Sequence, residues 1–188
     1  MRIENVSIVG MGALGVMYGD FLTEKMGKEH VEFVADSARI DRFQQEGMFC
    51  NRRACDFAIA DELETGRPAD LLIFAVKATG LEAAIHTVRN KVSKRTIILS
   101  LLNGITSEEI IGDAYGMDLI IHCIVQGMDT IKQNNQVTYA HFGHVRLGIH
   151  EENDVKKQNL QDVRDLFDRI KMPYAVEDDI LRRMWCKL

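Results

Sequence analysis

The sequence is poor in the residues that mark several classes of protein. It contains only two prolines among 188 residues, so no proline-rich linker divides it. It has four cysteines, and none of them forms a Cys-x-x-Cys pair: Cys50, Cys55, Cys123 and Cys186. We therefore expect the reduced thiols of a cytoplasmic protein rather than a disulfide framework or a zinc site.

Long hydrophobic runs and an excess of positive charge are also missing. The longest nearly apolar runs, such as 71–76 and 119–125, are far too short to span a bilayer. The N-terminus lacks the apolar region and cleavage site of a secretory signal. Lys and Arg number 23 against 28 Asp and Glu, a net charge of −5, which disfavours binding to nucleic acids or anionic membranes. The expected partner is a small molecule.

Apolar strands and amphipathic helices alternate along most of the chain. Apolar segments typical of buried strands lie at 3–9, 31–35, 71–76, 96–102 and 119–125. Between the first two, apolar residues from Leu14 to Leu22 recur at helical spacing. This alternation predicts an α/β fold, a doubly wound and mainly parallel sheet of the Rossmann type.

The pattern changes after Gln126. Segments 137–142 and 145–149 flank Gly143 and predict an antiparallel hairpin, which would form an antiparallel C-terminal extension of the sheet. A helix over 155–169, a short edge strand at 174–176 and an amphipathic helix over 178–188 are expected to follow.

A G-x-G-x-x-G sequence directly follows the first strand and opens the first helix. Its members are Gly10, Met11, Gly12, Ala13, Leu14 and Gly15. Gly10 permits a tight turn, Gly12 lets backbone N–H groups approach a pyrophosphate, and Gly15 lets the helix pack closely on the strand. The helix N-terminus adds partial positive charge. A glycine turn that binds nothing is the alternative, but the strand-to-helix context favours a dinucleotide site.

Two charged residues after the second strand bear on the choice of dinucleotide. Asp36 lies 21 residues after Gly15, where a carboxylate accepts hydrogen bonds from ribose hydroxyls and repels a 2′-phosphate. This position favours NAD(H), although Asp36 can also serve only as the cap of the next helix. Arg39, one turn later, can instead meet the 2′-phosphate of NADP(H), so these residues leave the choice open.

Four motifs together resemble the ketopantoate reductases (2-dehydropantoate 2-reductases). They are GMGALG at 10–15, FAVK at 74–77, LLNG at 101–104 and MWCKL at 184–188, in the family's order and at about its spacings. The first motif is common to many dehydrogenases, whereas the other three are more specific. The resemblance implies that NADPH reduces the ketone of a small 2-keto acid, ketopantoate, on the route to pantothenate and coenzyme A.

The resemblance also assigns roles to three side chains. It implies that Lys187 is the general acid that protonates the developing alkoxide, that Asn103 holds the substrate and the nicotinamide end of the cofactor, and that Lys77 binds near the nicotinamide ribose and assists the proton path. Lys77 and Asn103 each follow a buried strand, so they should face the crevice at the carboxyl edge of the sheet. Taken singly, the two lysines could be solvated surface residues and Asn103 a turn residue.

The chain departs from the family in two respects. The family usually has an arginine near the position of Asp36, which weakens the NADP(H) assignment. Its members run to roughly 300 residues, a two-domain length, and their helical second domain begins with the helix that carries Lys187. We therefore expect a dinucleotide-binding domain over 1–176, the first helix of a missing C-terminal helical domain over 177–188, and poor turnover by this chain alone.

Other assignments were weighed against this one. A non-catalytic NAD(P)-binding module is the alternative from another class, and a reductase of a different 2-keto acid is the alternative within the class. No metal is expected, because His141 and His144 lie on a predicted hairpin without a completing carboxylate or thiol. The last helix carries an apolar stripe that favours a homodimer: Ile180, Met184, Trp185 and Leu188.

Overall fold

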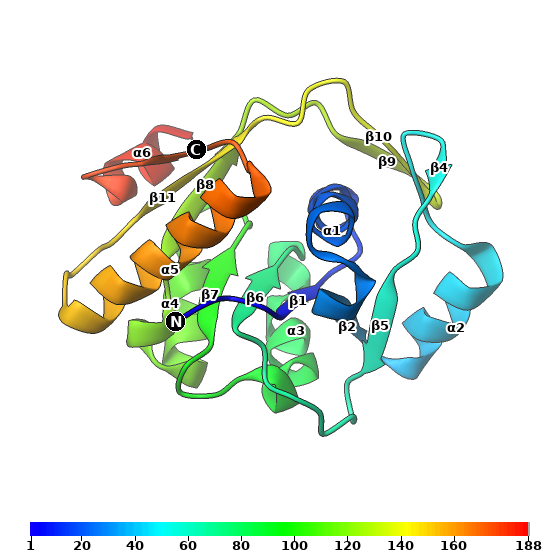
Figure 1. Ribbon diagram of the computed structural model, residues 1–188, viewed down its shortest axis with the longest axis horizontal. Coiled ribbons are helices and arrows are strands. Elements are labelled where there is room, and N and C mark those ends of the chain that lie inside the picture. Colours follow the sequence, from blue (N-terminus) through cyan, green and yellow to red (C-terminus); the bar gives the residue numbers. More distant parts are fainter. Residues whose placement is uncertain (188) are drawn as a thin grey trace.

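The computed structural model describes residues 1–187, and its centre is a parallel sheet (Figure 1). Five strands follow the order β5-β2-β1-β6-β7. Their bounds are β1 (Val6–Val9), β2 (Val31–Ala35), β5 (Ala58–Asp61), β6 (Leu71–Phe74) and β7 (Ile97–Ser100). The chain builds outward from β1 through β2 to β5, then returns to add β6 and β7 on the other side. This confirms the predicted Rossmann-type sheet, with its switch point between β1 and β6.

Helices cover both faces of the sheet, which explains why every residue of β1, β6 and β7 is buried. On one face, α1 (Ala13–Met26) and α5 (Asp154–Ile170) pack in the larger apolar core, around Met17 and Phe167. On the other, α3 (Leu81–Thr87) and α4 (Ser107–Tyr115) contribute Leu81 and Ile111 to a second core. α2 (Ser37–Glu46) follows β2 in the chain and lies beside β5 (Figure 1).

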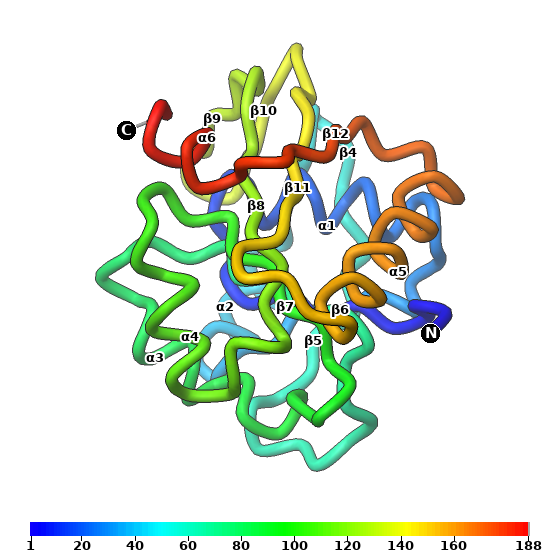
Figure 2. The backbone as a smooth tube through the Cα atoms, turned by 90° about the vertical axis from the view of Figure 1, so that its left-hand side faces the viewer, coloured from blue at the N-terminus to red at the C-terminus, as the bar shows by residue number. Residues whose placement is uncertain are grey.

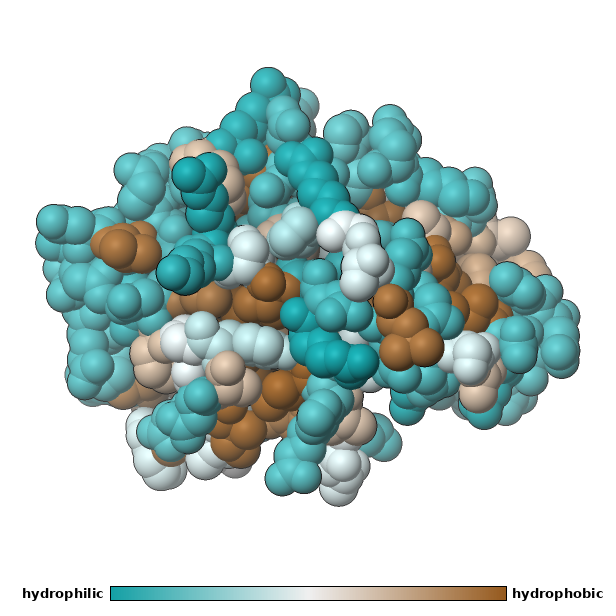
Figure 3. Space-filling model, turned by 90° about the horizontal axis from the view of Figure 1, so that it is seen from below, coloured by the Kyte–Doolittle hydropathy of each residue, from teal (hydrophilic) through white to brown (hydrophobic). Residues whose placement is uncertain are grey.

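Short 3₁₀ turns link several of these elements, at Lys28–His30, Ala78–Gly80, Arg89–Lys91 and Met117–Leu119. Seen from below, the surface shows several apolar patches separated by polar side chains (Figure 3). No helix among residues 1–187 combines the length and the apolar character needed to cross a membrane.

The C-terminal part adds strands of both directions. One parallel bridge joins Ile98 of β7 to Ile120, just before β8 (His122–Gln126). β8 pairs antiparallel with β11 (His144–Gly148), which pairs in parallel with β12 (Tyr174–Val176). The last helix, α6 (Ile180–Lys187), packs on β8 and β11, as Figure 2 shows. A separate small sheet joins β3 (Phe49–Cys50), β4 (Arg53–Ala54), β9 (Ile131–Gln133) and β10 (Gln136–Thr138).

The hairpin predicted around Gly143 is wrong. The segment before Gly143 forms no strand with β11; instead β9 and β10 make the hairpin, and Asn134 adopts the positive φ of 52° that its turn requires. β11 pairs with β8, which would otherwise present an unpaired edge. Gly143 serves that pairing, since a Cβ there would lie 2.3 Å from the Gln126 carbonyl oxygen.

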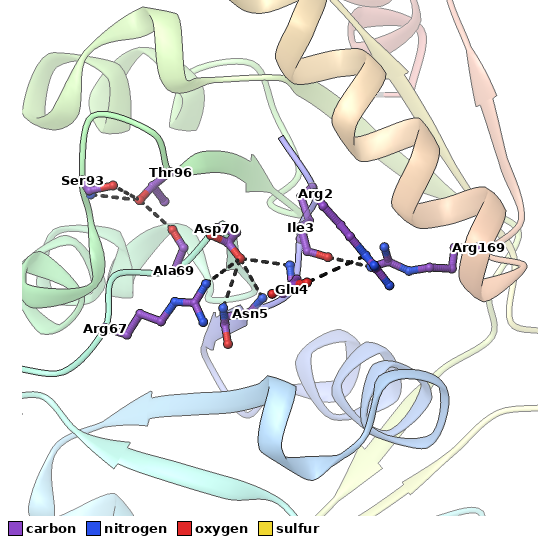
Figure 4. A network of polar contacts seen from close by, with 10 residues as sticks. All are labelled: Arg2, Ile3, Glu4, Asn5, Arg67, Ala69, Asp70, Ser93, Thr96 and Arg169. Carbon is purple, nitrogen blue, oxygen red and sulfur yellow. Dashed lines mark hydrogen bonds and ion pairs between the residues drawn. The ribbon is translucent and has the colours of Figure 1, made fainter.

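The amino edge of the sheet is closed by a polar network (Figure 4). The Asp70 carboxylate accepts hydrogen bonds from the backbone N–H groups of Glu4 and Asn5, both at 2.9 Å. Arg169 of α5 donates to the Ile3 carbonyl at 2.6 Å. These contacts tie the N-terminal segment to β6 and α5, so the functional crevice is sought at the opposite, carboxyl edge.

Candidate active site

The glycine-rich turn lies at the carboxyl end of β1, where the order of the strands reverses. Gly10 has a φ of +104°, which favours glycine, and a Cβ on Gly15 would lie only 1.9 Å from the Gly10 carbonyl oxygen. On Gly12 a Cβ would meet only the Ala75 carbonyl oxygen, at 3.6 Å. Gly12 is also the N-cap of α1, and among the described residues no side chain caps it. The first N–H groups of α1 are thus left to an anionic ligand.

A cleft of about 280 Å³ opens beside this turn, between the ends of β1, β2 and β6. Its walls include Gly10, Gly12, Ala35, Arg39 and Lys77. Lys77 is exposed and lies three residues after the end of β6. The position of the cleft is the one at which doubly wound sheets bind their ligands.

Asp36 and Arg39 contact one another at the start of α2. The Asp36 carboxylate caps the helix by accepting a hydrogen bond from the Arg39 backbone N–H at 2.8 Å, and it forms an ion pair with the Arg39 guanidinium. The helix-cap interpretation of Asp36 is therefore confirmed. Arg39 reaches the cleft, and Asp36 neutralises part of its charge.

Asn103 and Lys187, 84 positions apart, meet at the carboxyl end of β7. The Lys187 ammonium donates a hydrogen bond to Oδ1 of Asn103 at 2.9 Å. Leu102, Ile124 and Met184 line the small pocket around the pair. Partial burial lowers the pKa of Lys187, while the nearby Cys123 thiol has the opposite effect.

The position of α6 sets this contact. Ile180 and Met184 are each 1% exposed and pack on Ile124 of β8. Gly148 of β11 permits the close approach, because a Cβ there would lie 2.5 Å from Cβ of Ile180. The predicted apolar stripe is thus largely covered within the chain, with Trp185 exposed and Leu188 outside the described residues.

A buried polar chain under Asn103 escaped the sequence analysis. Glu108 is 0% exposed and accepts a hydrogen bond from the Ser107 hydroxyl at 2.8 Å; that hydroxyl lies 2.8 Å from the hydroxyl of Ser100. The Leu102 backbone N–H donates to the same Ser100 hydroxyl at 3.4 Å. Burial raises the pKa of Glu108 to about 7. In the sequence, the only sign of Glu108 is its position in the first turn of the helix after LLNG, and acidic residues are common in first turns.

Lys132 also escaped the sequence analysis. It belongs to β9, yet its ammonium donates a hydrogen bond to the carbonyl of Met11 in the glycine-rich turn, 121 positions away. In contrast, no hydrogen bond within residues 1–187 joins Lys77 to Asn103 or Lys187.

The described residues contain no group of three His, Cys, Asp or Glu side chains suited to a metal, and His141 pairs with Asp129 at 3.0 Å.

A Rossmann-type sheet with an uncapped glycine-rich turn at its switch point defines the class of dinucleotide-binding folds. Within this class, the model of the family described as ketopantoate reductase PanE/ApbA matches residues 6–152. The chain belongs to this family of oxidoreductases.

The individual relatives described next are each 22% or 23% identical to this chain. The uncharacterized oxidoreductase YkpB of Bacillus subtilis is 22% identical over 184 residues, which cover 96% of this chain and 59% of YkpB. The structure of 2-dehydropantoate 2-reductase from Geobacter metallireducens has a TM-score of 0.80 at 23% identity, covering 97% of this chain and 61% of that one. D-mandelate dehydrogenase with NADH and anilino(oxo)acetate also has a TM-score of 0.80, at 22% identity, with 97% and 60% covered. The chain thus spans less than two thirds of each relative.

Proposed function

We propose that this chain is the dinucleotide-binding part of an NAD(P)H-dependent reductase of a 2-keto acid, with ketopantoate as substrate and pantoate as product. The observation that carries the proposal is the hydrogen bond between Lys187 and Asn103, at the same sheet edge as the glycine-rich turn. Membership of the ketopantoate reductase family supports this substrate and its place on the route to pantothenate and coenzyme A.

The turn fits a dinucleotide because Gly12 leaves space beside the free N–H groups of α1. We assign the pyrophosphate to residues 10–15 and the nicotinamide ribose to Lys77, which lies in the same cleft. The nicotinamide, when bound, supplies a hydride to the carbonyl carbon of the substrate.

The reaction leaves negative charge on the ketone oxygen, and Lys187 is placed to protonate it. Its lowered pKa makes the ammonium a readier donor near neutral pH. Asn103 accepts from Lys187 through Oδ1, which fixes the ammonium and leaves the amide N–H groups to hold a substrate oxygen.

Replacing Lys187 with alanine should lower kcat by about 10² to 10⁴, the usual range for a general acid. Asn103→Ala should raise KM as well, and the double variant should lose little more than Lys187→Ala because the two groups act as a unit. The exposed Lys94 offers a matched control, Lys94→Ala, with unchanged rates. Steady-state oxidation of NADPH and NADH with ketopantoate measures this, with every variant made in a version of the chain extended by a helical domain of a relative. Full activity of Lys187→Ala would overturn its role.

One observation favours a second substrate. D-mandelate dehydrogenase is as similar in fold as the dehydropantoate reductase, so an aryl 2-keto acid is the alternative. Parallel assays with ketopantoate and 2-oxo-2-phenylacetate separate the two, using this chain and a version extended by a helical domain of a relative. Dinucleotide binding without turnover in either version would instead favour a non-catalytic module.

The division of the chain and its self-association are parts of the same proposal. We assign residues 1–176 to the dinucleotide-binding domain and 177–188 to the start of a helical unit. Trp185, 60% exposed on α6, is an apolar side chain available for a contact with that unit or with a second copy. Light scattering of the chain and of Trp185→Ala tests the homodimer, which predicts a dimer that the substitution dissociates.

A further inference from the structure

Two of the four cysteines meet in the β3–β4 hairpin, outside the residues assigned to the active site. Cys50 is the last residue of β3 and pairs with Arg53 of β4. The two residues between them, Asn51 and Arg52, have φ values of 47° and 66°, as in a tight two-residue hairpin turn. Residues paired across antiparallel strands share a face, and so do residues two apart along one strand. Cys55 therefore lies on the same face as Cys50.

The pairing continues for one residue past β4 and ties Cys55 to β3. The Cys55 backbone N–H donates a hydrogen bond to the Met48 carbonyl at 2.8 Å. Cys50 is 1% exposed in the larger apolar core, whereas Cys55 packs against that core and stays partly exposed. Both thiols are free. One thiol of the pair is thus shielded, and the other is open to a small reagent.

The two thiols also influence each other's ionisation. A hydrogen bond between them lowers the pKa of Cys50 and raises that of Cys55. Burial and the Asp20 carboxylate oppose the lowering at Cys50, while the Arg53 guanidinium, which pairs with Asp20 at 2.7 Å, adds to it. When the pair loses a proton, the two sulfurs therefore share the one that remains.

We propose that Cys50 and Cys55 form a reversible disulfide by exchange with a small disulfide such as oxidised glutathione. Cys55 passes its proton to the Cys50 sulfur and attacks one sulfur of the reagent, which releases a glutathione thiolate. Cys50 then attacks the Cys55 sulfur of this mixed disulfide, and its proton leaves with the second glutathione. The two thiols are oxidised by two electrons, which reduce the reagent to two thiols. The inference does not depend on the proposed function.

Trypsin makes this disulfide directly visible, because it cuts after Arg52 and Arg53, between the two cysteines. The test uses a folded Cys186→Ser chain, which lacks the exposed thiol and keeps three of the four cysteines. Oxidised glutathione should remove two of these three thiols. After alkylation and digestion without reductant, mass spectrometry should show peptide 43–52 linked to the peptide that begins at Ala54. Dithiothreitol should separate the two peptides and restore both thiols.

Single substitutions in the same chain separate the roles of the two thiols. Cys50→Ser should trap the mixed disulfide of Cys55 with glutathione, whereas Cys55→Ser should leave the buried Cys50 thiol unmodified. Cys123, 0% exposed and hydrogen-bonded to the Ser100 carbonyl, is the internal control and should keep its thiol throughout. Unfolding midpoints show that each variant is folded.

Three results would overturn the inference. Linked peptides that form only in urea would show that the folded hairpin holds the thiols apart. A stable glutathione adduct on Cys55 while Cys50 is present would show that Cys50 cannot reach it, and an unmodified pair in the folded chain would show that both sulfurs are shielded. All three leave the reductase proposal standing, because neither cysteine is assigned to the dinucleotide or the substrate.

Discussion

Gly15→Ala should abolish measurable dinucleotide binding and lower the free energy of unfolding by about 3 kcal/mol, the upper part of the range for overpacking. The added methyl group would lie 1.9 Å from the Gly10 carbonyl oxygen and 3.2 Å from Cβ of Ala75. Gly10 lies in the glycine-rich turn and Ala75 follows β6 with a side chain too short to move aside. The clash can therefore be relieved only by moving the turn or α1. Denaturant unfolding and titration with NADPH measure the two effects.

Gly12→Ala is the matched comparison within the same motif. Its Cβ would stand 3.6 Å from the Ala75 carbonyl oxygen, an ordinary contact, and φ at Gly12 is −74°, which alanine adopts freely. Stability should therefore change by less than about 0.5 kcal/mol. Binding should still weaken at least tenfold, because the methyl group stands where the pyrophosphate must approach. Equal stability losses in the two variants, or normal NADPH binding by Gly15→Ala, would contradict this division of roles.

The sequence was a reliable guide wherever the determining contacts are local. Continuous apolar runs predicted the strands that form β1, β2, β6 and β7, because both sheet faces are covered and no polar alternation intervenes. Asp36 starts α2 by accepting a hydrogen bond from the Arg39 backbone N–H, a cap that needs only a residue three positions away. The parallel direction of these strands followed from the alternation of strands and helices, because a helix that connects two strands of one sheet makes them parallel.

Pairings between distant segments could not be predicted in the same way. The partner of β11 is β8 rather than the adjacent segment, and β10 lies parallel to β3, because unpaired strand edges are satisfied by segments far along the chain. The same limit applies to the site. The contact of Lys187 with Asn103 was expected only from the resemblance, and that of Lys132 with Met11 was not expected, since each spans over 80 positions.

Glu108→Gln should make the protein more stable at pH 8 by up to about 3 kcal/mol, while stability near pH 4 stays close to that of the parent. Burial raises the pKa of Glu108 to about 7 from 4.5, so the folded chain holds this proton more tightly than the unfolded chain does. A raised carboxyl pKa contributes stability that is complete below about pH 4.5 and is lost as the pH rises through about 7. Glutamine keeps an acceptor for the Ser107 hydroxyl without the charge.

Glu109, the exposed next residue, provides the control, and Glu109→Gln should change stability by less than about 0.5 kcal/mol at either pH. His122, whose pKa burial lowers to about 4, also makes stability depend on pH, but it is common to all three proteins and cancels from the difference. Urea unfolding from pH 4 to 8 gives the comparison. A Glu108→Gln variant that is least stable at pH 8 would mean that the hydrogen bond from Ser107 to the ionised carboxylate outweighs the cost of burying its charge. With the predicted sign, the cost of burying the Glu108 charge outweighs the hydrogen bond from the Ser107 hydroxyl, which favours the ionised carboxylate.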